Sequence, residues 1–248
     1  MRRFYIEQSE AFKDKVVMAG DDAKHIINVL RLKSGDMITL FDGTGHEYVS
    51  RIDGIVSGNV DISILERTIA ETESPIKIIV AQAFLKEKKM DMLVRQLTEL
   101  GIAGWFPFIS ERSVSRPDKK RIESRIKRWE RISKESLKQC RRGVMPEIGD
   151  LLDFDGVLKL SEKYDNKIVF WENETRPLDS SIISTKNDDN ILVLIGPEGG
   201  FSDNEIIHAK EKGLITAALG PRILKAETAS IVACSLIQYL FGDLGKKS

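Results

Sequence analysis

Apolar and polar positions follow two alternating patterns along the last two-thirds of the chain. Short apolar runs predict buried strands at residues 76–84, 102–110, 167–172, 191–196 and 214–220. Between and after these runs, apolar residues recur every three or four positions, which predicts helices within residues 88–101, 116–142 and 228–244. Strands that alternate with helices in this way are typical of an α/β fold with a mainly parallel sheet.

The beginning of the chain has a different pattern of short segments. Runs typical of strands occur at residues 36–43, 47–52 and 58–66. Residues 21–32 predict a short helix, capped by Asp21 or Asp22. The polar stretch that follows the strands is typical of a linker. We therefore expect two domains, a small β-rich domain over residues 1–70 and the α/β domain over residues 75–248.

The amino-acid composition argues against several classes of protein. The chain has 248 residues, two cysteines (Cys140 and Cys234) and three scattered histidines, so we expect neither a disulfide framework nor a metal site. The N-terminal residues contain no apolar segment typical of a signal peptide, and no run approaches the length of a membrane span. These features predict a soluble, cytoplasmic protein that does not bind a membrane.

Net charge is zero, but the charge is unevenly distributed. Residues 116–142 contain twelve basic and four acidic residues, a local charge of +8. The amphipathic helix expected there would carry lysine and arginine on its outer face, including Arg125, Arg128 and Arg131. Two interpretations stay open for this face, a solvated surface or a contact with a polyanion such as RNA.

Two glycine-rich loops each follow a predicted strand and precede a predicted helix. The first contains Gly-Pro-Glu-Gly-Gly at residues 196–200, followed by a Ser-x-x-Glu capping box at Ser202 and Glu205. The second begins at residue 219. Such loops are either tight turns or, at one end of a parallel sheet, the two sides of a ligand site. Neither loop has the P-loop or dinucleotide-binding fingerprint, which argues against a nucleotide-binding oxidoreductase.

The two motifs LIGPEGGFSDNE (residues 194–205) and LGPRILKAETA (residues 219–229) resemble the ribosomal RNA small-subunit methyltransferase E family of the knotted SPOUT superfamily. The likeness extends to HIINVLRLKSGDMITLFDG, KKM with TELG, PFISERSV and QCRRGVMPEI, in that order along the chain. It implies a PUA-like β-barrel that binds RNA, followed by a methyltransferase domain with a trefoil knot, a rare exception to unknotted topology.

The resemblance also implies an activity. S-adenosylmethionine would donate a methyl group to N3 of one uridine in the decoding region of 16S ribosomal RNA. It implies a homodimer that completes the active site across two subunits. Two alternatives stay open: an RNA methyltransferase of the same fold that acts at another position, and a non-catalytic RNA-binding module.

The implied cofactor site lies in the two glycine motifs, at Gly196, Glu198, Gly199, Gly200, Leu219, Gly220, Ile223, Leu224 and Thr228. Gly199 and Gly200 would let the backbone approach the cofactor closely, so we expect Gly199→Val to abolish binding. Ile223 and Leu224 would contact the adenine. Thr228 would either cap the last helix or contact the cofactor.

Catalysis requires a group that accepts the N3 proton of the uridine. Glu198 is the candidate base, with a structural role in its turn as the alternative, and Arg222 or Arg142 would stabilise charge on the uracil carbonyls. The implied RNA-binding residues are Arg31, Arg112, Arg125, Arg128, Arg131 and Arg142. Departures from the family pattern occur at Arg95-Gln96, at Gly143 and at Lys225, which replaces a common arginine; they put the detailed placement of RNA in doubt.

Overall fold

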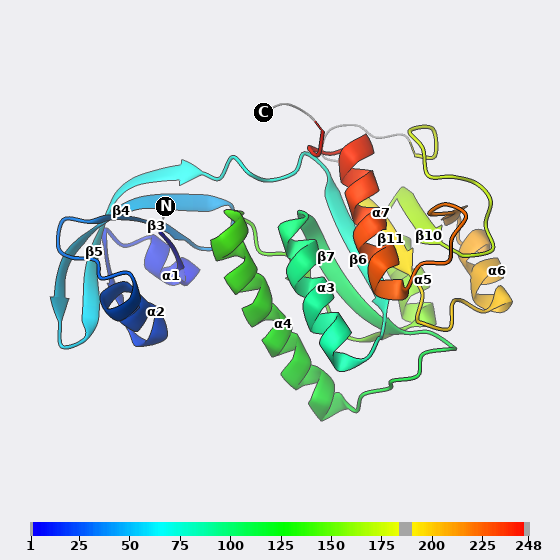
Figure 1. Cartoon of the computed structure of the whole chain (residues 1–248), viewed down its shortest axis with the longest axis horizontal. Helices are drawn as coiled ribbons and strands as arrows, with labels where there is room; N and C mark the ends of the chain where they lie inside the picture. Colours follow the sequence, from blue (N-terminus) through cyan, green and yellow to red (C-terminus); the bar gives the residue numbers. More distant parts are fainter. Residues whose placement is uncertain (1, 184–189, 246–248) are drawn as a thin grey trace. The chain divides into compact units, whose positions relative to one another are not determined.

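The computed structural model describes residues 2–183 and 190–245, and the chain divides into two compact units (Figure 1). The first unit comprises Met1–Glu73 and Leu137–Met145, and the second comprises Ser74–Ser136 and Pro146–Ser248. The division after Glu73 falls inside the linker expected from the sequence. The apolar pattern did not predict that residues 137–145 belong to the first unit.

The first unit is built on a five-stranded sheet with the order β1-β3-β4-β5-β2. Its strands are β1 (Arg3–Tyr5), β2 (Lys15–Met18), β3 (Met37–Phe41), β4 (His46–Val56) and β5 (Asn59–Ile69). β1 runs parallel to β3, and the other pairings are antiparallel. Two register shifts between β4 and β5 strengthen the twist of the sheet. Within the described residues β1 and β2 are free edges, so the strands form a half-barrel.

Two short helices accompany this sheet, α1 (Gln8–Ala11) and α2 (Gly20–Lys24), and α2 continues as a π-helical turn over His25–Val29. The predicted cap at Asp21 or Asp22 is wrong, because the N-cap is Ala19. The helix begins at Gly20, one residue before the predicted start. Gly20 adopts a positive φ of 68°, which glycine tolerates best. Ala23 and Ile26 are fully buried in the core of the half-barrel.

The second unit contains a seven-stranded sheet with the order β12-β10-β11-β6-β7-β8, and β9 also pairs with β7. The strands are β6 (Lys77–Ala83), β7 (Ile102–Ile109), β8 (Glu147–Ile148), β9 (Leu152–Asp153), β10 (Asn166–Phe170), β11 (Asn190–Ile195) and β12 (Ile215–Ala217). All their pairings are parallel, which confirms the sheet predicted from the sequence.

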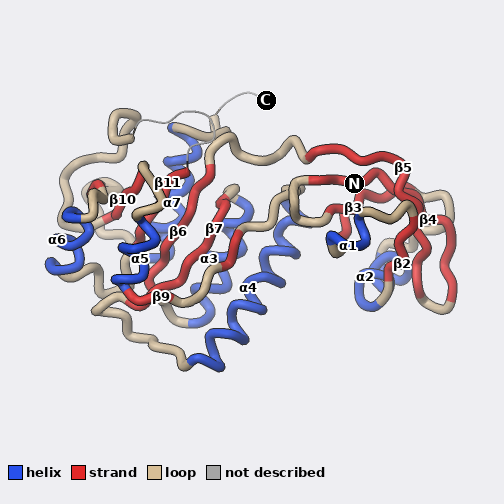
Figure 2. Tube along the Cα trace, turned by 180° about the vertical axis from the view of Figure 1, so that it is seen from behind, coloured by secondary structure: helices blue, strands red, loops and turns tan. Residues whose placement is uncertain are grey.

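Helices cover both faces of this sheet. They are α3 (Glu87–Glu99), α4 (Lys119–Cys140), α5 (Phe154–Ser161), α6 (Asp203–Glu211) and α7 (Ala226–Leu240). α3, α4 and α7 lie on one face, and α5 and α6 lie on the other (Figures 1 and 2). The helix α5 and the short strands β8 and β9 were not predicted, because these brief segments lack a sustained apolar period.

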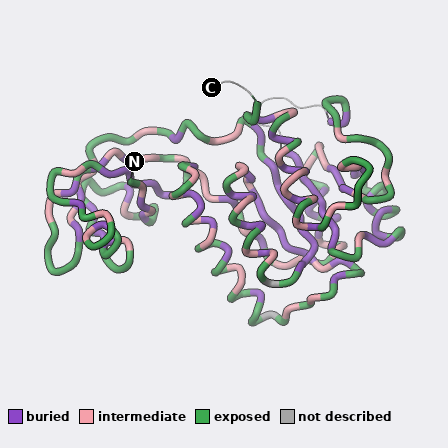
Figure 3. The backbone as a smooth tube through the Cα atoms, in the orientation of Figure 1, coloured by how far each residue is buried: buried purple, intermediate pink, exposed green. Residues whose placement is uncertain are grey.

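Alternating side chains of the central strands supply a separate core on each face. Ile78 and Val80 of β6 pack with α3, α4 and α7, whereas Ile79 and Ala81 pack with α5 and α6. Figure 3 shows the resulting continuous buried strands beneath helices with exposed outer sides. A strand buried on both faces needs an unbroken apolar run, which is why these strands were recognisable in the sequence.

The connection from β10 to β11 includes residues 184–189, which lie outside the described residues. The trefoil knot depends on the complete path of the chain and therefore stays a prediction. Within the described residues, no helix is both long enough and apolar enough to cross a membrane.

Candidate active site

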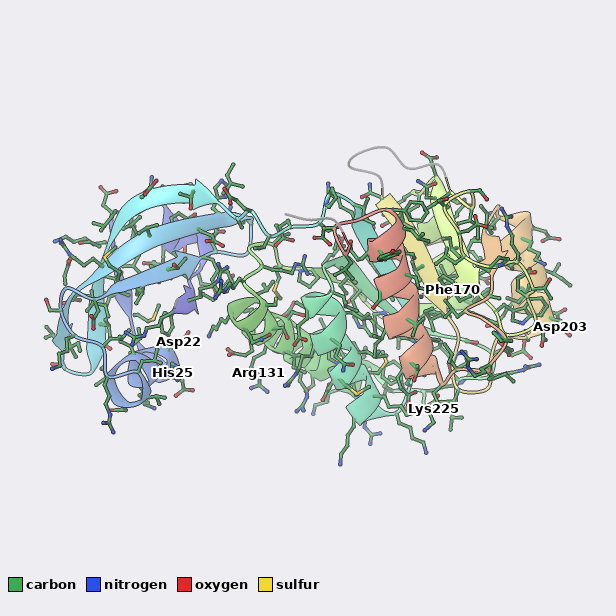
Figure 4. All side chains as sticks on the ribbon, turned by 45° about the horizontal axis from the view of Figure 1, so that its top comes forward. Asp22, His25, Arg131, Phe170, Asp203 and Lys225 are labelled. Atoms are coloured by element: carbon green, nitrogen blue, oxygen red, sulfur yellow. The ribbon has the colours of Figure 1, made fainter. Side chains whose placement is uncertain are left out.

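A cavity of about 460 Å³ lies in the second unit, at the carboxyl ends of β10, β11 and β12. Parallel sheets commonly bind ligands at this edge, because the loops after neighbouring strands converge there. Phe170 lies on β10 and Lys225 lies at the start of α7 (Figure 4). The lining residues are Lys89, Phe170, Trp171, Glu172, Glu174, Ile195, Gly196, Pro197, Glu198, Gly200, Ala218, Leu219, Gly220, Pro221, Arg222, Ile223, Leu224, Lys225, Ala226, Glu227 and Ala229.

The first loop, residues 196–202, joins β11 to α6 and is held by groups outside the cavity. Gln82, fully buried on β6, donates a hydrogen bond to the carbonyl of Gly196 at 3.4 Å and accepts one from the hydroxyl of Ser230 on α7. The guanidinium of Arg112 donates to the carbonyls of Gly199 and Phe201, each at 3.2 Å. These bonds fix the path of the loop before any ligand binds.

The end of the first loop forms the predicted capping box, which the structure confirms. Glu205 accepts from the backbone N–H of Ser202 at 2.9 Å, and Ser202 accepts from that of Glu205 at 3.3 Å. The buried Glu205 carboxylate also accepts from the Ser110 hydroxyl at 3.0 Å and from the Glu111 N–H at 2.9 Å. The cap of α6 therefore also ties the first loop to the segment that follows β7.

The second loop, residues 218–225, joins β12 to α7 and has far fewer attachments. Its first residue, Ala218, donates a hydrogen bond to the carbonyl of Arg176 at 2.8 Å. The described part of the chain supplies no hydrogen bond to residues 219–224. Gly220 has a φ of +97° and open space around it, and Ile223 is 86% exposed. This side of the cavity presents backbone and apolar surface without side-chain restraints.

A third side of the cavity, residues 170–174 after β10, was missed by the sequence analysis. Glu174 accepts hydrogen bonds from the Thr216 hydroxyl and from the backbone N–H groups of Arg176 and Thr175. These bonds lower the pKa of Glu174 to about 2. The strand over 167–172 was predicted, and the rule that ligands bind at the carboxyl ends of parallel strands would have pointed to this segment.

Lys89 of α3 was also missed, although it connects two sides of the cavity. Its ammonium lies 3.1 Å from Oε1 of Glu198 and 3.1 Å from Oε2 of Glu227, the second residue of α7. Burial alone would lower the pKa of Lys89, but its hydrogen bond to Glu198 and its ion pair with Glu227 outweigh burial and raise this pKa. Burial opposes ionisation of Glu227 as well, yet a backbone N–H and Lys89 lower its pKa. Lys89 and Glu227 are therefore both charged at neutral pH.

The chemistry of the lining suits a ligand that is cationic and partly apolar. The lining contains four carboxylates and three basic side chains, a net charge of −1. Phe170, Ile195, Leu219 and Leu224 add apolar surface, and three glycines expose backbone groups. The described residues contain no group of three or more histidine, cysteine or acidic side chains that could hold a metal ion.

Most residues that the sequence assigned to the site meet in this cavity. The lining includes Gly196, Glu198, Gly200, Leu219, Gly220, Arg222, Ile223 and Leu224. Gly199, Thr228 and Arg142 are not part of it. Two loops that α6 and β12 separate in the sequence are thus brought together by β12, which pairs with β10 beside β11.

The two adjacent glycines have different surroundings, and the expected close approach of a ligand to Gly199 stays a prediction. A Cβ at Gly199 would point to Arg112, 3.3 Å from its Cβ, and not into the cavity. Gly200 is the lining residue of the pair, with a positive φ of 70°. A Cβ there would lie 1.9 Å from Oε1 of Glu172. A side chain is therefore excluded at Gly200, the second glycine of the pair.

Thr228 and Arg142 lie elsewhere. α7 begins at Ala226 with Lys225 as its N-cap, so the expectation that Thr228 caps this helix is wrong. Arg142 belongs to the first unit, where its buried guanidinium is bound to Glu73 with an Nη2–Oε2 distance of 2.8 Å. The other oxygen of Glu73 accepts from the backbone N–H groups that follow Arg142. The observed contacts give Arg142 a structural role.

The arginines assigned to RNA binding have varied surroundings. Arg112 holds the first loop, as described above. On α4, Arg128 is bound to Asp91 with an Nε–Oδ2 distance of 2.7 Å, the guanidinium of Arg125 lies 5.0 Å from the ring centre of Phe84, and Arg131 is exposed (Figure 4). In the first unit, Arg31 is exposed and has a φ of +53°, a conformation that is uncommon outside glycine.

Comparison with protein families gives two matches along the chain. Residues 72–238 match the model of an RNA methyltransferase domain, and residues 19–65 match that of an RNA methyltransferase PUA domain. The first match covers the α/β unit with its cavity, and the second covers most of the half-barrel. Together they place a PUA match before an RNA methyltransferase match along the chain.

Individual relatives agree along nearly their whole length. The chain is 30% identical to ribosomal RNA small subunit methyltransferase E of Bacillus subtilis (strain 168), covering 96% of both chains. It is 32% identical to the protein of that name from Buchnera aphidicola subsp. Schizaphis graminum, covering 98% of this chain and 97% of the relative. The structure of the Neisseria gonorrhoeae protein bound to S-adenosyl methionine is 30% identical, covers 98% and 99% of the two chains and superimposes with a TM-score of 0.84. The chain therefore belongs to the ribosomal RNA small subunit methyltransferase E family.

Proposed function

We propose that this protein transfers the methyl group of S-adenosylmethionine to N3 of one uridine in the decoding region of 16S ribosomal RNA. The observation that carries the proposal is the cavity, in which both glycine motifs of the family meet at the carboxyl ends of parallel strands. Modification of ribosomal RNA would place the protein in the cytoplasm, as a factor in ribosome biogenesis.

The residues of the cavity fit this methyl donor. Its volume of about 460 Å³ lies within the range of roughly 300–1,000 Å³ usual for small-ligand sites. S-adenosylmethionine carries a sulfonium, an ammonium and a carboxylate, so its net charge of about +1 complements the net −1 of the lining. Leu219, Ile223 and Leu224 would contact the adenine, and backbone groups of the second loop would bind its edge. The relative from Neisseria gonorrhoeae binds the same molecule.

When bound, S-adenosylmethionine supplies an electrophilic methyl group on sulfur. The chain would hold the acceptor base and remove its proton, because N3 of uridine is protonated at neutral pH. Glu198 is the carboxylate of the first loop that lines the cavity, and we assign it the role of proton acceptor. Arg222 in the second loop would stabilise negative charge on the uracil carbonyls. Because N3 lies on the Watson–Crick edge, the target base must be unpaired or extruded.

Basic residues of α4 would contact the phosphates of the RNA. Neutralising Arg125, Arg128 and Arg131 together should weaken RNA binding and reduce its salt slope by about one unit for each lost phosphate contact. S-adenosylmethionine affinity should change little, because none of the three lines the cavity. An unchanged salt slope would mean that this face of α4 is only solvated.

We also propose that the protein acts as a homodimer. α7 exposes Tyr239 by 64% and Leu236 by 37%, an apolar surface that a twofold interface would bury. The family habit of completing the active site across two subunits agrees with this surface. A monomer at micromolar concentration that keeps full activity, measured by sedimentation, would contradict the dimer.

The central experiment is methylation of small ribosomal subunits or 16S RNA by the purified protein and S-adenosylmethionine. We expect one new stop in reverse transcription, at a uridine of the decoding region, and 3-methyluridine in the nucleoside digest. Ribose 2′-O-methylation, or methylation of transfer RNA alone, would contradict the substrate assignment. Binding of S-adenosylmethionine without modification of any RNA would contradict catalysis and leave an RNA-binding module.

A further inference from the structure

We infer that Lys89 is the positioning residue for Glu198, and that Glu227 is the counter-ion that keeps Lys89 paired when Glu198 takes up a proton. This inference rests on the proposed methyl transfer to uridine N3. It assigns roles to two cavity residues that the sequence motifs alone did not single out.

The geometry places one cation between two carboxylates from separate elements. Lys89 lies on α3, Glu198 in the first loop and Glu227 in the first turn of α7. The Lys89 ammonium is 3.1 Å from one oxygen of each carboxylate. The side chains of Lys89 and Glu198 are each 31% exposed, and that of Glu227 is 16% exposed. A lysine ammonium has three donors, so it can serve both carboxylates at once.

The contact with Lys89 differs for the two oxygens of Glu198. Oε1 accepts the hydrogen bond from Lys89. Within the described residues, no hydrogen bond or ion pair reaches Oε2. Lys89 therefore holds the carboxylate by one oxygen and leaves the other available. The geometry makes Oε2 the atom that meets the N3–H of the uridine.

The charges explain why two carboxylates share one lysine. During the reaction the N3 proton would pass to Oε2, the N3 electron pair would form the new bond to the methyl carbon, and the pair of the broken carbon–sulfur bond would stay on sulfur. Glu198 is then neutral, and an ammonium paired with Glu198 alone would lose its counter-ion in a half-buried site, which is costly. Glu227 remains charged beside Lys89, so the net charge of the three groups changes from −1 to zero.

The test compares three variants with a matched control. Lys89→Met removes the cation, Lys89→Arg keeps a cation, and Glu227→Gln removes the counter-ion. Lys212→Met is the control, because Lys212 forms an exposed ion pair with Glu162 at 2.8 Å and does not line the cavity. For each variant, calorimetry would give the affinity for S-adenosylmethionine. Single-turnover methylation of small ribosomal subunits would give the methylation rate at pH values from about 5.5 to about 9.

We expect Lys89→Met to lower the rate at neutral pH by about tenfold or more, with the affinity for S-adenosylmethionine changed less than about threefold. The midpoint of its pH–rate profile should move upward, because the carboxylate form of Glu198 loses its neighbouring cation. In Glu227→Gln the midpoint should move downward, because a negative neighbour is removed. Lys89→Arg should restore most of the rate, and Lys212→Met should match the parent protein.

The other charged groups that line the cavity with Glu198 stay the same in all variants. They are Arg222 and Lys225 of the second loop and Glu172 and Glu174 after β10. A Lys89→Met variant with the parental rate and pH profile would overturn the inference. Equal losses of affinity and rate, with no shift of the profile, would also overturn it and leave Lys89 as a brace between α3 and α7. If the parent protein does not methylate N3, the proposed function fails instead.

Discussion

The two glycine loops that meet at the cavity look alike in sequence and differ in how they are held. The first loop is fixed by Arg112, by Gln82 and by the Ser202–Glu205 capping box, all outside the cavity. Within the described residues the second loop is attached at its two ends only, and Lys225, the N-cap of α7, makes no side-chain capping bond. A glycine-rich motif therefore does not by itself indicate a rigid site.

This difference suggests a division of roles between the loops. The first loop carries the proposed base, Glu198, and a base must keep its geometry within a fraction of an ångström during catalysis. The second loop presents backbone to the adenine, and a loop with few restraints can close around a ligand and be ordered by it. The predictions below test this division, beginning with the largest expected effect.

Removing the buried carboxylate of Glu205 should have the largest effect on the first loop. In Glu205→Ala, the N–H groups of Ser202 and Glu111 and the hydroxyl of Ser110 lose their acceptor. We expect a loss of about 3 kcal/mol in the free energy of unfolding, because buried donors would be left without partners. All three tryptophans lie in the second unit, so urea unfolding followed by tryptophan fluorescence reports this unit.

The control for this variant is Asp203→Ala, in the same turn of α6 and exposed (Figure 4). Within the described residues no hydrogen bond or ion pair reaches its carboxylate, which lies in the first turn of α6, so the expected loss is the helix-dipole contribution of about 0.5 kcal/mol. Similar losses in the two variants would contradict the idea that Glu205 anchors the first loop.

The adjacent glycines of the first loop should respond differently to alanine. Gly200→Ala forces a side chain into a φ of +70° and displaces Glu172, so we expect a loss of about 1–2 kcal/mol in stability and at least about tenfold in affinity for S-adenosylmethionine. Gly199→Ala faces Arg112 and should cost less than about 0.5 kcal/mol, with little change in affinity. The reverse order of affinities would restore the original expectation for Gly199.

Hydrogen exchange should distinguish the loops without any mutation. Addition of S-adenosylmethionine should slow amide exchange clearly in residues 218–225 and only slightly in residues 196–202, because the second loop has few bonds of its own. The measurement is exchange followed by mass spectrometry, with and without the ligand. Equal protection of both loops would show that neither is preformed.

The smallest expected effect concerns acid stability near the base of the second loop. The folded pKa of Glu174 is about 2, below its ordinary value of 4.5, so its charged form stabilises the fold. This contribution is complete above pH 4.5 and is lost as the pH falls toward 2. Glu174→Gln should therefore reduce the difference in urea midpoint between pH 6 and pH 3. Because the group is partly exposed, we expect well under about 1 kcal/mol.

Glu172→Gln is the matched control for this prediction. Glu172 lies two residues away on the same segment and is exposed. Glu172→Gln should leave the difference in urea midpoint between pH 6 and pH 3 unchanged. If both variants reduce it equally, general charge and not the hydrogen bonds of Glu174 would explain the acid sensitivity.

Several features of the fold were predictable because their signals are local. The apolar runs marked the long parallel strands, since a strand buried on both faces has few polar positions to interrupt it. Ser202 and Glu205 marked the start of α6, since a capping box needs only residues three apart. The cap of the last helix was not predictable in this way, because Lys225 satisfies no backbone N–H with its side chain.

By itself, the sequence determined the alternation of the long strands and helices, the family motifs and the glycine loops, because each depends on residues close together in the chain. Only the tertiary structure decided which groups meet. It placed Lys89 beside Glu198, 109 residues away, and bound Arg142 to Glu73 within the first unit. It also turned Gly199 away from the cavity and Gly200 toward it. Such contacts depend on strand order and on the direction of each Cα–Cβ bond, which no local pattern of residues specifies.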